Sequence, residues 1–134
     1  MIRYLHHVGV AVGNLEEAAK AYQALGLSVT KVETVPSEEV RVAFIPVGET
    51  HIELLEPTSP HSPIARFLEK RGPGVHHLCL AVGDLAHLMD RARAGGLKLL
   101  DETPRVGASG SRVCFIHPKS VGGVLVELWQ DDHA

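Results

Sequence analysis

The chain has 134 residues, of which 45% are hydrophobic and 22% are charged, and its net charge is −3. These values are typical of one compact domain with enough apolar side chains for a core. Basic residues are outnumbered and never cluster, which argues against a nucleic-acid-binding surface, and no apolar run approaches the roughly 20 residues that span a bilayer. The first residues lack the basic and then apolar pattern of a secretion signal, so we expect a cytoplasmic protein.

An internal duplication is the main feature of the sequence. Residues 5–15 (LHHVGVAVGNL) and residues 75–85 (VHHLCLAVGDL) lie 70 positions apart and are identical at six of eleven positions. Such a repeat dictates the architecture, because both copies are expected to form the same structural unit. Each segment predicts a strand that leads into an amphipathic helix, with Asn14 as the helix N-cap in the first copy and Asp84 in the second.

Three further strands are predicted after the helix of each copy, because Val, Ile, Phe and Leu are enriched in short runs bounded by Gly, Pro and Ser. Each copy therefore has the order strand, helix, strand, strand, strand (βαβββ). The runs cover residues 27–35, 39–47 and 50–56 in the first copy and residues 97–100, 111–117 and 122–130 in the second.

The connection between the copies predicts a short helix, in which Ser62 is the N-cap and Pro63 the first helical residue. The chain thus divides into module one (1–56), a linker helix (57–73) and module two (74–134). Because a unit of about 60 residues is only marginally stable alone, we expect one domain. The predicted fold class is α+β, with two tandem βαβββ modules that form one curved eight-stranded mixed sheet.

Four polar side chains occupy matching positions in the two modules. His7 and His77 are the second histidines of the two His-His pairs, and they take the same place in the alternation of their strands. Glu53 and Glu127 match in the same way, each between aliphatic neighbours in the last strand of its module. A carboxylate in such a strand is costly to bury unless it is paired or bound to a metal. The repetition of the pattern indicates a shared role.

These four residues are predicted to converge on one metal ion enclosed by the curved sheet. Two imidazoles and two carboxylates differ from the thiolate-rich, closed set of a structural zinc site. They suit an octahedral divalent ion (Co, Mn, Ni, Fe or Zn) with two positions left for water or substrate. A lone histidine or glutamate in a strand is more often a core residue with an ordinary polar partner. The matched pairs favour the metal.

The remaining histidines and both cysteines have structural interpretations. His6 and His76 point away from the predicted ligands, where they are expected to pack or to hydrogen-bond behind them. Cys79 and Cys114 lie in apolar runs and are predicted to be buried, unpaired thiols of a reducing compartment. His117 belongs to a loop. Surface positions are predicted for His51, His61, His87 and His133.

With these paired modules and matched residues, the chain resembles the vicinal oxygen chelate superfamily, which includes glyoxalase I, extradiol dioxygenases and antibiotic-resistance proteins. Within that superfamily it looks like the methylmalonyl-CoA epimerases over nearly its whole length. The resemblance rests on LHHVGVAV at 5–12, IELLEP at 52–57, SPIARFLEKRGPGVHHLCLAV at 62–82 and HPKSVGGVLVEL at 117–128. The last of these four stretches is the most specific.

The resemblance implies a function, which is stated here as an expectation. The family interconverts (R)- and (S)-methylmalonyl-CoA by removing a proton next to the thioester, through an enolate. Its usual ion is cobalt(II), with Mn, Ni or Zn as alternatives. Some relatives carry Gln in place of the first of its two carboxylate ligands. The family's metal ligands fall on His7, Glu53, His77 and Glu127 of this chain.

The same resemblance implies further roles. Glu127 corresponds to a catalytic glutamate of the family and is the expected general base. Because the CoA part of the substrate carries phosphates, Lys119 in the His-Pro-Lys-Ser loop is the expected contact for it. The Gly- and Ser-rich stretch at 101–112 is a candidate lid over the substrate. A homodimer is expected.

In one respect the chain departs from some relatives, which carry a second catalytic glutamate on the third strand of module one. Here that strand reads EVRVAFIPV, with Arg41 and Val42 near the expected position. Glu38 and Glu39 lie only at its mouth. The second acid or base is therefore open, as is the return of the proton by a single base or by water.

Other activities also fit this scaffold. A glyoxalase I-like enzyme performs a similar proton transfer on a glutathione adduct, and a drug-binding resistance protein uses the fold without a metal. The intact ligand positions argue against the drug-binding protein, which does not need them. A dioxygenase fits less well, because its iron usually takes two histidines and one carboxylate and leaves three positions open.

Overall fold

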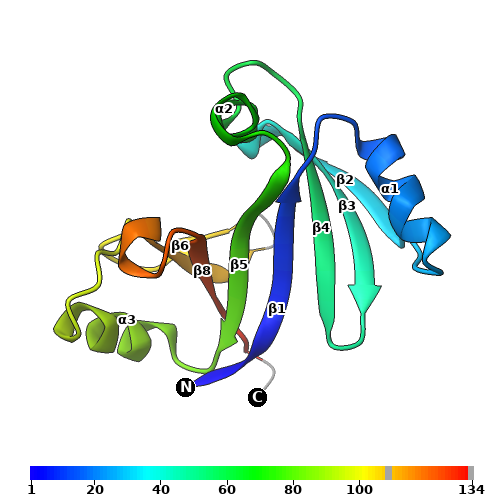
Figure 1. The fold of residues 1–134 in the computed structure, drawn as a ribbon. Coiled ribbons are helices and arrows are strands. Elements are labelled where there is room, and N and C mark those ends of the chain that lie inside the picture. The colour runs from blue at the N-terminus through cyan, green and yellow to red at the C-terminus, as the bar shows by residue number, and fades with distance from the viewer. Residues whose placement is uncertain (108–109, 133–134) are drawn as a thin grey trace. The chain divides into compact units, whose positions relative to one another are not determined.

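The structure is a computed structural model that describes residues 1–107 and 110–132 (Figure 1). The chain folds into two compact units. We call residues 7–76 the N-terminal unit, and residues 77–134 together with residues 1–6 the C-terminal unit. The linker helix belongs to the N-terminal unit. His133 and part of the candidate lid loop lie outside the described residues.

The N-terminal unit contains the second half of strand β1 (Ile2–Ala11) and a four-stranded arrangement in the order β2-β3-β4-β1. Strand β1 runs parallel to β4, whereas the β2–β3 and β3–β4 neighbours are antiparallel. The remaining elements are helix α1 (Leu15–Ala24), strand β2 (Lys31–Val35), a 3-10 turn (Pro36–Glu38), strands β3 (Val40–Val47) and β4 (Thr50–Pro57), and helix α2 (Pro63–Arg71).

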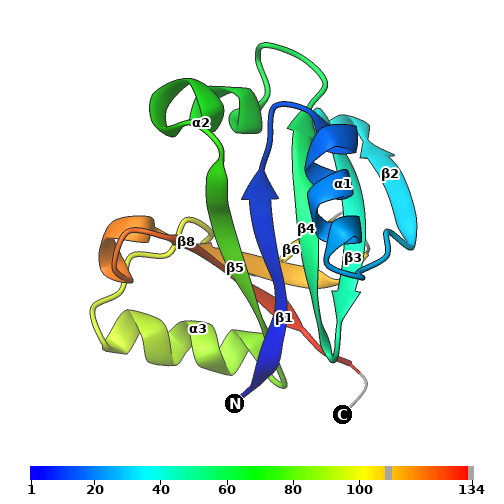
Figure 2. The same ribbon diagram turned by 45° about the vertical axis from the view of Figure 1, so that its right-hand side comes forward.

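Helix α1 begins where the sequence predicts it. The Asn14 side chain accepts a hydrogen bond of 2.9 Å from the backbone N–H of Glu17, which satisfies one of the otherwise unpaired amides of the first turn. The helix covers one face of the strands (Figure 2). Burial of apolar side chains from the helix and the strands holds it there. This first core consists of Val12, Leu15, Ala19, Ala43, Ile45 and Leu54.

Helix α2 covers one end of the opposite face. Its predicted N-cap is confirmed, since the Ser62 hydroxyl accepts a hydrogen bond of 3.1 Å from the backbone N–H of Ile64. Strand alternation places His7 and Glu53 on this same face, further along the strands. Beneath the helix lies a second core of Ala11, Val40, Val42, Leu55 and Ile64.

The C-terminal unit repeats the design in the strand order β5-β8-β7-β6, with β5 parallel to β8. Helix α3 is capped as predicted, because the Asp84 carboxylate accepts a hydrogen bond of 3.1 Å from the backbone N–H of His87. The helix packs on a third core that includes Leu85, Met89 and Leu128. The elements are β5 (Gly74–Val82), α3 (Leu85–Ala94), β6 (Arg105–Val106), β7 (Arg112–Ile116), a 3-10 turn (Pro118–Ser120) and β8 (Leu125–Gln130).

The strand predicted at 97–100 is wrong. In this part of the chain the second strand of the repeat is β6, at Arg105–Val106, and Leu99 makes only an isolated bridge to Ile116. The physical reason lies in the side chains, because Leu97 and Leu99 pack against the core under α3. Their alternation therefore marks a segment that covers the core without joining a regular ladder.

Two other strands begin later than predicted. Leu27 and Val29 pack against the core under α1 before the chain starts to pair as β2. Strand β8 begins after Gly122 and Gly123, whose φ angles of 87° and 103° form a turn that side-chain-bearing residues rarely adopt. In both places the predicted strand starts too early, because the prediction rests on apolar composition and the apolar residues begin before the chain pairs with a neighbouring strand.

The larger features of the prediction are confirmed. Each repeat has the order βαβββ, the described residues contain eight strands and three α-helices, and the fold class is α+β. Neither Cys79 nor Cys114 forms a disulfide, and both are 0% exposed. Among the described residues, none of the helices combines the length and the apolar character needed to cross a membrane.

Candidate metal centre

The N-terminal unit brings its two predicted ligands into contact. Strands β1 and β4 are parallel neighbours, in which His7 pairs with His51 and Gly9 pairs with Glu53. Their register places the His7 Nδ1 atom 3.2 Å from the Glu53 Oε2 atom. Only 8% and 14% of the two side chains are exposed. A largely dehydrated imidazole and carboxylate therefore form the first half of the candidate centre.

The C-terminal unit forms an equivalent pair. In the parallel ladder of β5 and β8, Cys79 pairs with Glu127, as Gly9 pairs with Glu53 in the other unit. The His77 Nε2 atom lies 3.5 Å from the Glu127 Oε1 atom, and the two side chains are 10% and 15% exposed. The duplication thus produces the same contact twice, once within each unit.

The chemistry of each pair fits a divalent ion. An imidazole nitrogen and a carboxylate oxygen are ligands that Co, Mn, Ni and Zn accept. Low exposure favours such binding, because a buried carboxylate gains most from a nearby positive charge. Each unit therefore supplies one nitrogen and one oxygen donor of the predicted set.

His51 is a site residue that the sequence analysis missed. It was expected at the surface, but its side chain is 21% exposed and its Nε2 atom lies 2.8 Å from the Glu53 Oε2 atom. The His51 ring also lies near the His7 ring, with 5.2 Å between their centroids. The signal was the spacing of two residues between His51 and Glu53, which puts both on one face of β4.

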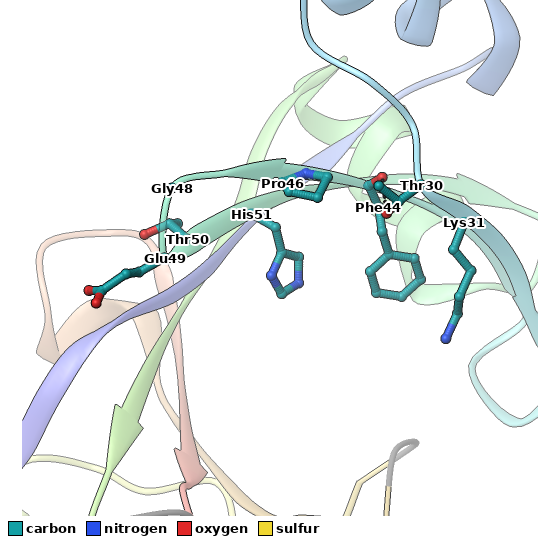
Figure 3. Close-up of a pocket in the computed structure, with 8 residues that line it drawn as sticks. All are labelled: Thr30, Lys31, Phe44, Pro46, Gly48, Glu49, Thr50 and His51. Atoms are coloured by element: carbon teal, nitrogen blue, oxygen red, sulfur yellow. Dashed lines mark hydrogen bonds between the residues drawn. The ribbon is translucent and has the colours of Figure 1, made fainter.

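A pocket of about 290 Å³ opens on this side of the N-terminal unit. Figure 3 shows Lys31, Phe44 and His51 extending to the same side of their strands. His51 lines this pocket and also contacts Glu53, which is not itself among the lining residues. The full lining consists of Thr30, Lys31, Phe44, Pro46, Gly48, Glu49, Thr50 and His51.

Each carboxylate also faces an aromatic ring across its antiparallel neighbour. Phe44 on β3 pairs with Glu53, and Phe115 on β7 pairs with Glu127. A cation covers each ring, with Lys31 Nζ 5.1 Å from the centroid of the Phe44 ring and the Arg105 guanidinium 4.9 Å from that of Phe115. The Glu53 and Glu127 side chains are only 14% and 15% exposed, and low exposure strengthens the electrostatic interactions of a carboxylate.

His6 and His76 make ring contacts of the kind predicted for packing residues. The His6 ring stacks on Trp129 with 4.2 Å between centroids, and the His76 ring meets the edge of Phe67 at 5.1 Å. His61 is exposed, as is His87, as the sequence predicts.

The position of a second acid or base holds no carboxylate in β3. Val42 is 4% exposed and belongs to the core beneath α2. Arg41 points to the α1 side, where its guanidinium pairs with Glu16 and Glu56. At the mouth of the strand, Glu39 accepts a hydrogen bond of 2.8 Å from the hydroxyl of Ser59.

Lys119 is exposed in the 3-10 turn that follows β7. Hydrogen bonds from backbone N–H groups to side chains order the loop around it. The Lys119 N–H donates to His117 Nδ1 at 3.1 Å, and the Lys98 N–H donates to the Ser120 hydroxyl at 3.0 Å. The turn thus holds a positive charge at a defined place on the surface.

Comparison with known proteins identifies relatives over the whole chain. Residues 6–115 match the family model described as the Glyoxalase/Bleomycin resistance protein/Dioxygenase superfamily. The Cereibacter sphaeroides ethylmalonyl-CoA/methylmalonyl-CoA epimerase is 44% identical over 97% of this chain and 99% of its own length.

Solved structures agree with the sequence relatives. The crystal structure of methylmalonyl-CoA epimerase from Mycobacterium tuberculosis has a TM-score of 0.86 and 40% identity, and the match covers 96% of this chain and 88% of that one. A methylmalonyl-CoA epimerase in complex with methylmalonyl-CoA and NH4+ has a TM-score of 0.89 and 32% identity over 99% and 97% of the two chains. The chain therefore belongs to the methylmalonyl-CoA epimerase family of the glyoxalase superfamily.

Proposed function

We propose that this chain interconverts (R)- and (S)-methylmalonyl-CoA. The observation that carries the proposal is a likeness to epimerases that extends over 97% of the chain, together with a buried His–Glu pair in each unit. A glyoxalase activity and a metal-free drug-binding role are not favoured, because the Cereibacter sphaeroides and Mycobacterium tuberculosis relatives, which match over nearly the whole chain, bear the name of epimerases.

Membership of this superfamily implies a divalent metal ion. We propose that the four residues hold one such ion per chain, with cobalt(II) as the first choice and manganese, nickel or zinc as alternatives. Support comes from the donor types and from the separate His–Glu contact in each unit. The proposed ligands are His7, Glu53, His77 and Glu127.

The reaction needs a base and a means of stabilising negative charge. When bound, a divalent ion supplies Lewis acidity that stabilises the oxygen of an enolate. Glu127 is the proposed base: its carboxylate takes the proton from the carbon between the thioester and the free carboxylate, and the electron pair of the broken C–H bond moves into the enolate. Return of a proton to the opposite face of that carbon completes the inversion.

The apolar surroundings of the pairs serve this chemistry. Phe44 and Phe115 flank the two carboxylates and limit their contact with water. In such an environment a fixed charge stabilises a developing enolate more strongly than in bulk water. No acid is assigned to the face of the carbon opposite the proposed base, because β3 has Arg41 and Val42 near the position where some relatives have glutamate. Water is therefore one route for returning the proton.

Other roles stay predictions from the family resemblance. Lys119 is proposed to contact the phosphates of CoA, for which its exposed ammonium group is suited. A homodimer, a cytoplasmic location and a place in propionate metabolism are expected on the same ground.

Solvent exchange tests the proposed function directly. Cobalt-loaded protein is incubated in D2O with methylmalonyl-CoA, and deuterium at the carbon next to the thioester is followed by mass spectrometry. We expect uptake of one deuterium together with interconversion of the epimers. Uptake into a glutathione hemithioacetal, with none into methylmalonyl-CoA, would instead identify a glyoxalase-like enzyme.

A further inference from the structure

The strands that carry the two carboxylates differ at one position of their common face. Strand β4 has His51 two residues before Glu53, whereas β8 has Leu125 two residues before Glu127. The two positions are structurally equivalent, because His51 pairs with His7 in the β1–β4 ladder and Leu125 pairs with His77 in the β5–β8 ladder. The duplication has therefore diverged directly beside the candidate ligands.

His51 is held in place by its neighbours on both sides. Its ring lies 5.2 Å from the His7 ring and 5.7 Å from the Phe44 ring, centroid to centroid. From this position its Nε2 atom reaches the Glu53 Oε2 atom at 2.8 Å, which is closer than the 3.2 Å from His7 Nδ1 to the same oxygen. Neighbouring strands thus direct the His51 nitrogen toward one oxygen of Glu53.

This contact restricts the carboxylate. An N–H donor on one oxygen fixes the plane of the group and hence the place of the other oxygen, so less rotational freedom is lost when an ion binds. Outer partners of this kind commonly orient metal ligands. The equivalent position of β8 holds Leu125, whose side chain carries no donor, so His51 is a feature of β4 that the duplication does not repeat there.

We propose that His51 is a positioning residue that holds Glu53 as a fixed metal ligand. The inference rests on the proposed role of Glu53 as a ligand of the ion. A carboxylate whose plane is already fixed loses less freedom when it binds, so the contact with His51 favours binding at Glu53.

Cobalt binding tests the role of His51 without reference to turnover. H51F keeps a ring beside Phe44 but removes the donor, and H51Q restores an N–H donor on a flexible side chain. We expect H51F to weaken cobalt(II) affinity about 10–100-fold, measured by competition with a chelating dye, and to alter the visible absorption of bound cobalt. H51Q should recover most of the affinity and the wild-type spectrum.

The matched control is H87F, which changes an exposed histidine on α3. It should bind cobalt as the unaltered protein does. Wild-type affinity in H51F would overturn the proposal, and so would H51Q affinity no better than that of H51F. Circular dichroism melting curves confirm that the variants compared are folded.

The two readouts separate this inference from the proposed function. If wild-type protein binds cobalt but exchanges no deuterium into methylmalonyl-CoA, the proposed function is wrong, and the His51 result still stands on affinity alone. If exchange proceeds and H51F binds cobalt normally, the function stands and the positioning role is wrong.

Discussion

The N-terminal and C-terminal units build the same polar set from the same strands, yet they surround it differently. In each unit a histidine and a glutamate from parallel strands lie within 3.5 Å, and a phenylalanine covered by a cation faces the glutamate. The N-terminal unit adds His51 to its carboxylate and covers one end of the face with α2. The duplication therefore preserved the register of the strands, whereas the residue two positions before each glutamate diverged and is His51 in β4 but Leu125 in β8.

The largest expected difference between the two units is in the roles of Glu53 and Glu127. E127Q removes the proposed base while it keeps an oxygen that can bind the ion, so we expect proton exchange to fall by about 10²–10⁴-fold, the range of general base catalysis. E53Q should lower exchange by no more than about tenfold, because the amide oxygen can still serve as a ligand. Deuterium uptake rates at saturating substrate measure both, and similar losses would contradict separate roles.

The core under α1 and the core under α3 can be compared through a matched pair of leucines. Leu54 and Leu128 follow the two glutamates and are 0% and 2% exposed. L54A and L128A should each lower the free energy of unfolding by about 2–5 kcal/mol, since each leaves a cavity in a packed core. Urea denaturation measures the loss, and a cost below about 1 kcal/mol in either variant would contradict the described packing.

The helix caps offer a smaller, equally matched test. N14A and D84A remove the side chains that accept the N–H groups of Glu17 and His87. Each should cost about 0.5–2 kcal/mol of unfolding free energy, whereas N14S and D84S should keep most of it. Alanine and serine variants of equal stability would show that these caps do not contribute.

The smallest expected effect is a dependence of stability on pH that arises from Cys114 in the C-terminal unit. Burial, and then the nearby Asp101 carboxylate, raise the pKa of the Cys114 thiol from 9.0 to about 11. The unfolded chain therefore loses this proton at lower pH than the folded chain, so the contribution to stability is complete below pH 9 and is lost as pH rises toward 11. Between pH 8 and pH 11 the melting temperature of the wild type should fall relative to that of C114V; a constant difference between the two would contradict the raised pKa.

The sequence predicts the ligand pairs because two constraints act together. Alternation along a strand decides which face His7 and Glu53 share, and the repeat identifies His77 and Glu127 as their counterparts. Neither constraint depends on knowing which strands are neighbours. For this reason the His–Glu pairs can be predicted from the sequence alone, and so can the helix caps.

The rest depends on pairing between distant segments. His51 was misplaced because its burial comes from strands β1 and β3 on either side, which local spacing does not reveal. Phe44 likewise lies opposite Glu53 because of the register between β3 and β4, which local spacing does not reveal. The strand predicted at 97–100 failed because Leu97 and Leu99 use the same alternation to cover a core. Alternation shows which side chains are buried, but register determines what they meet.

Metal titration tests the central claim most directly, namely that donors from both units hold a single ion. Cobalt(II) is added to metal-free protein and followed by calorimetry and visible absorption, with H7A and H77A as matched variants. We predict one cobalt per chain and an affinity at least about 100-fold lower in both variants. Two ions per chain, or an H77A variant that titrates like the unaltered protein, would contradict the account.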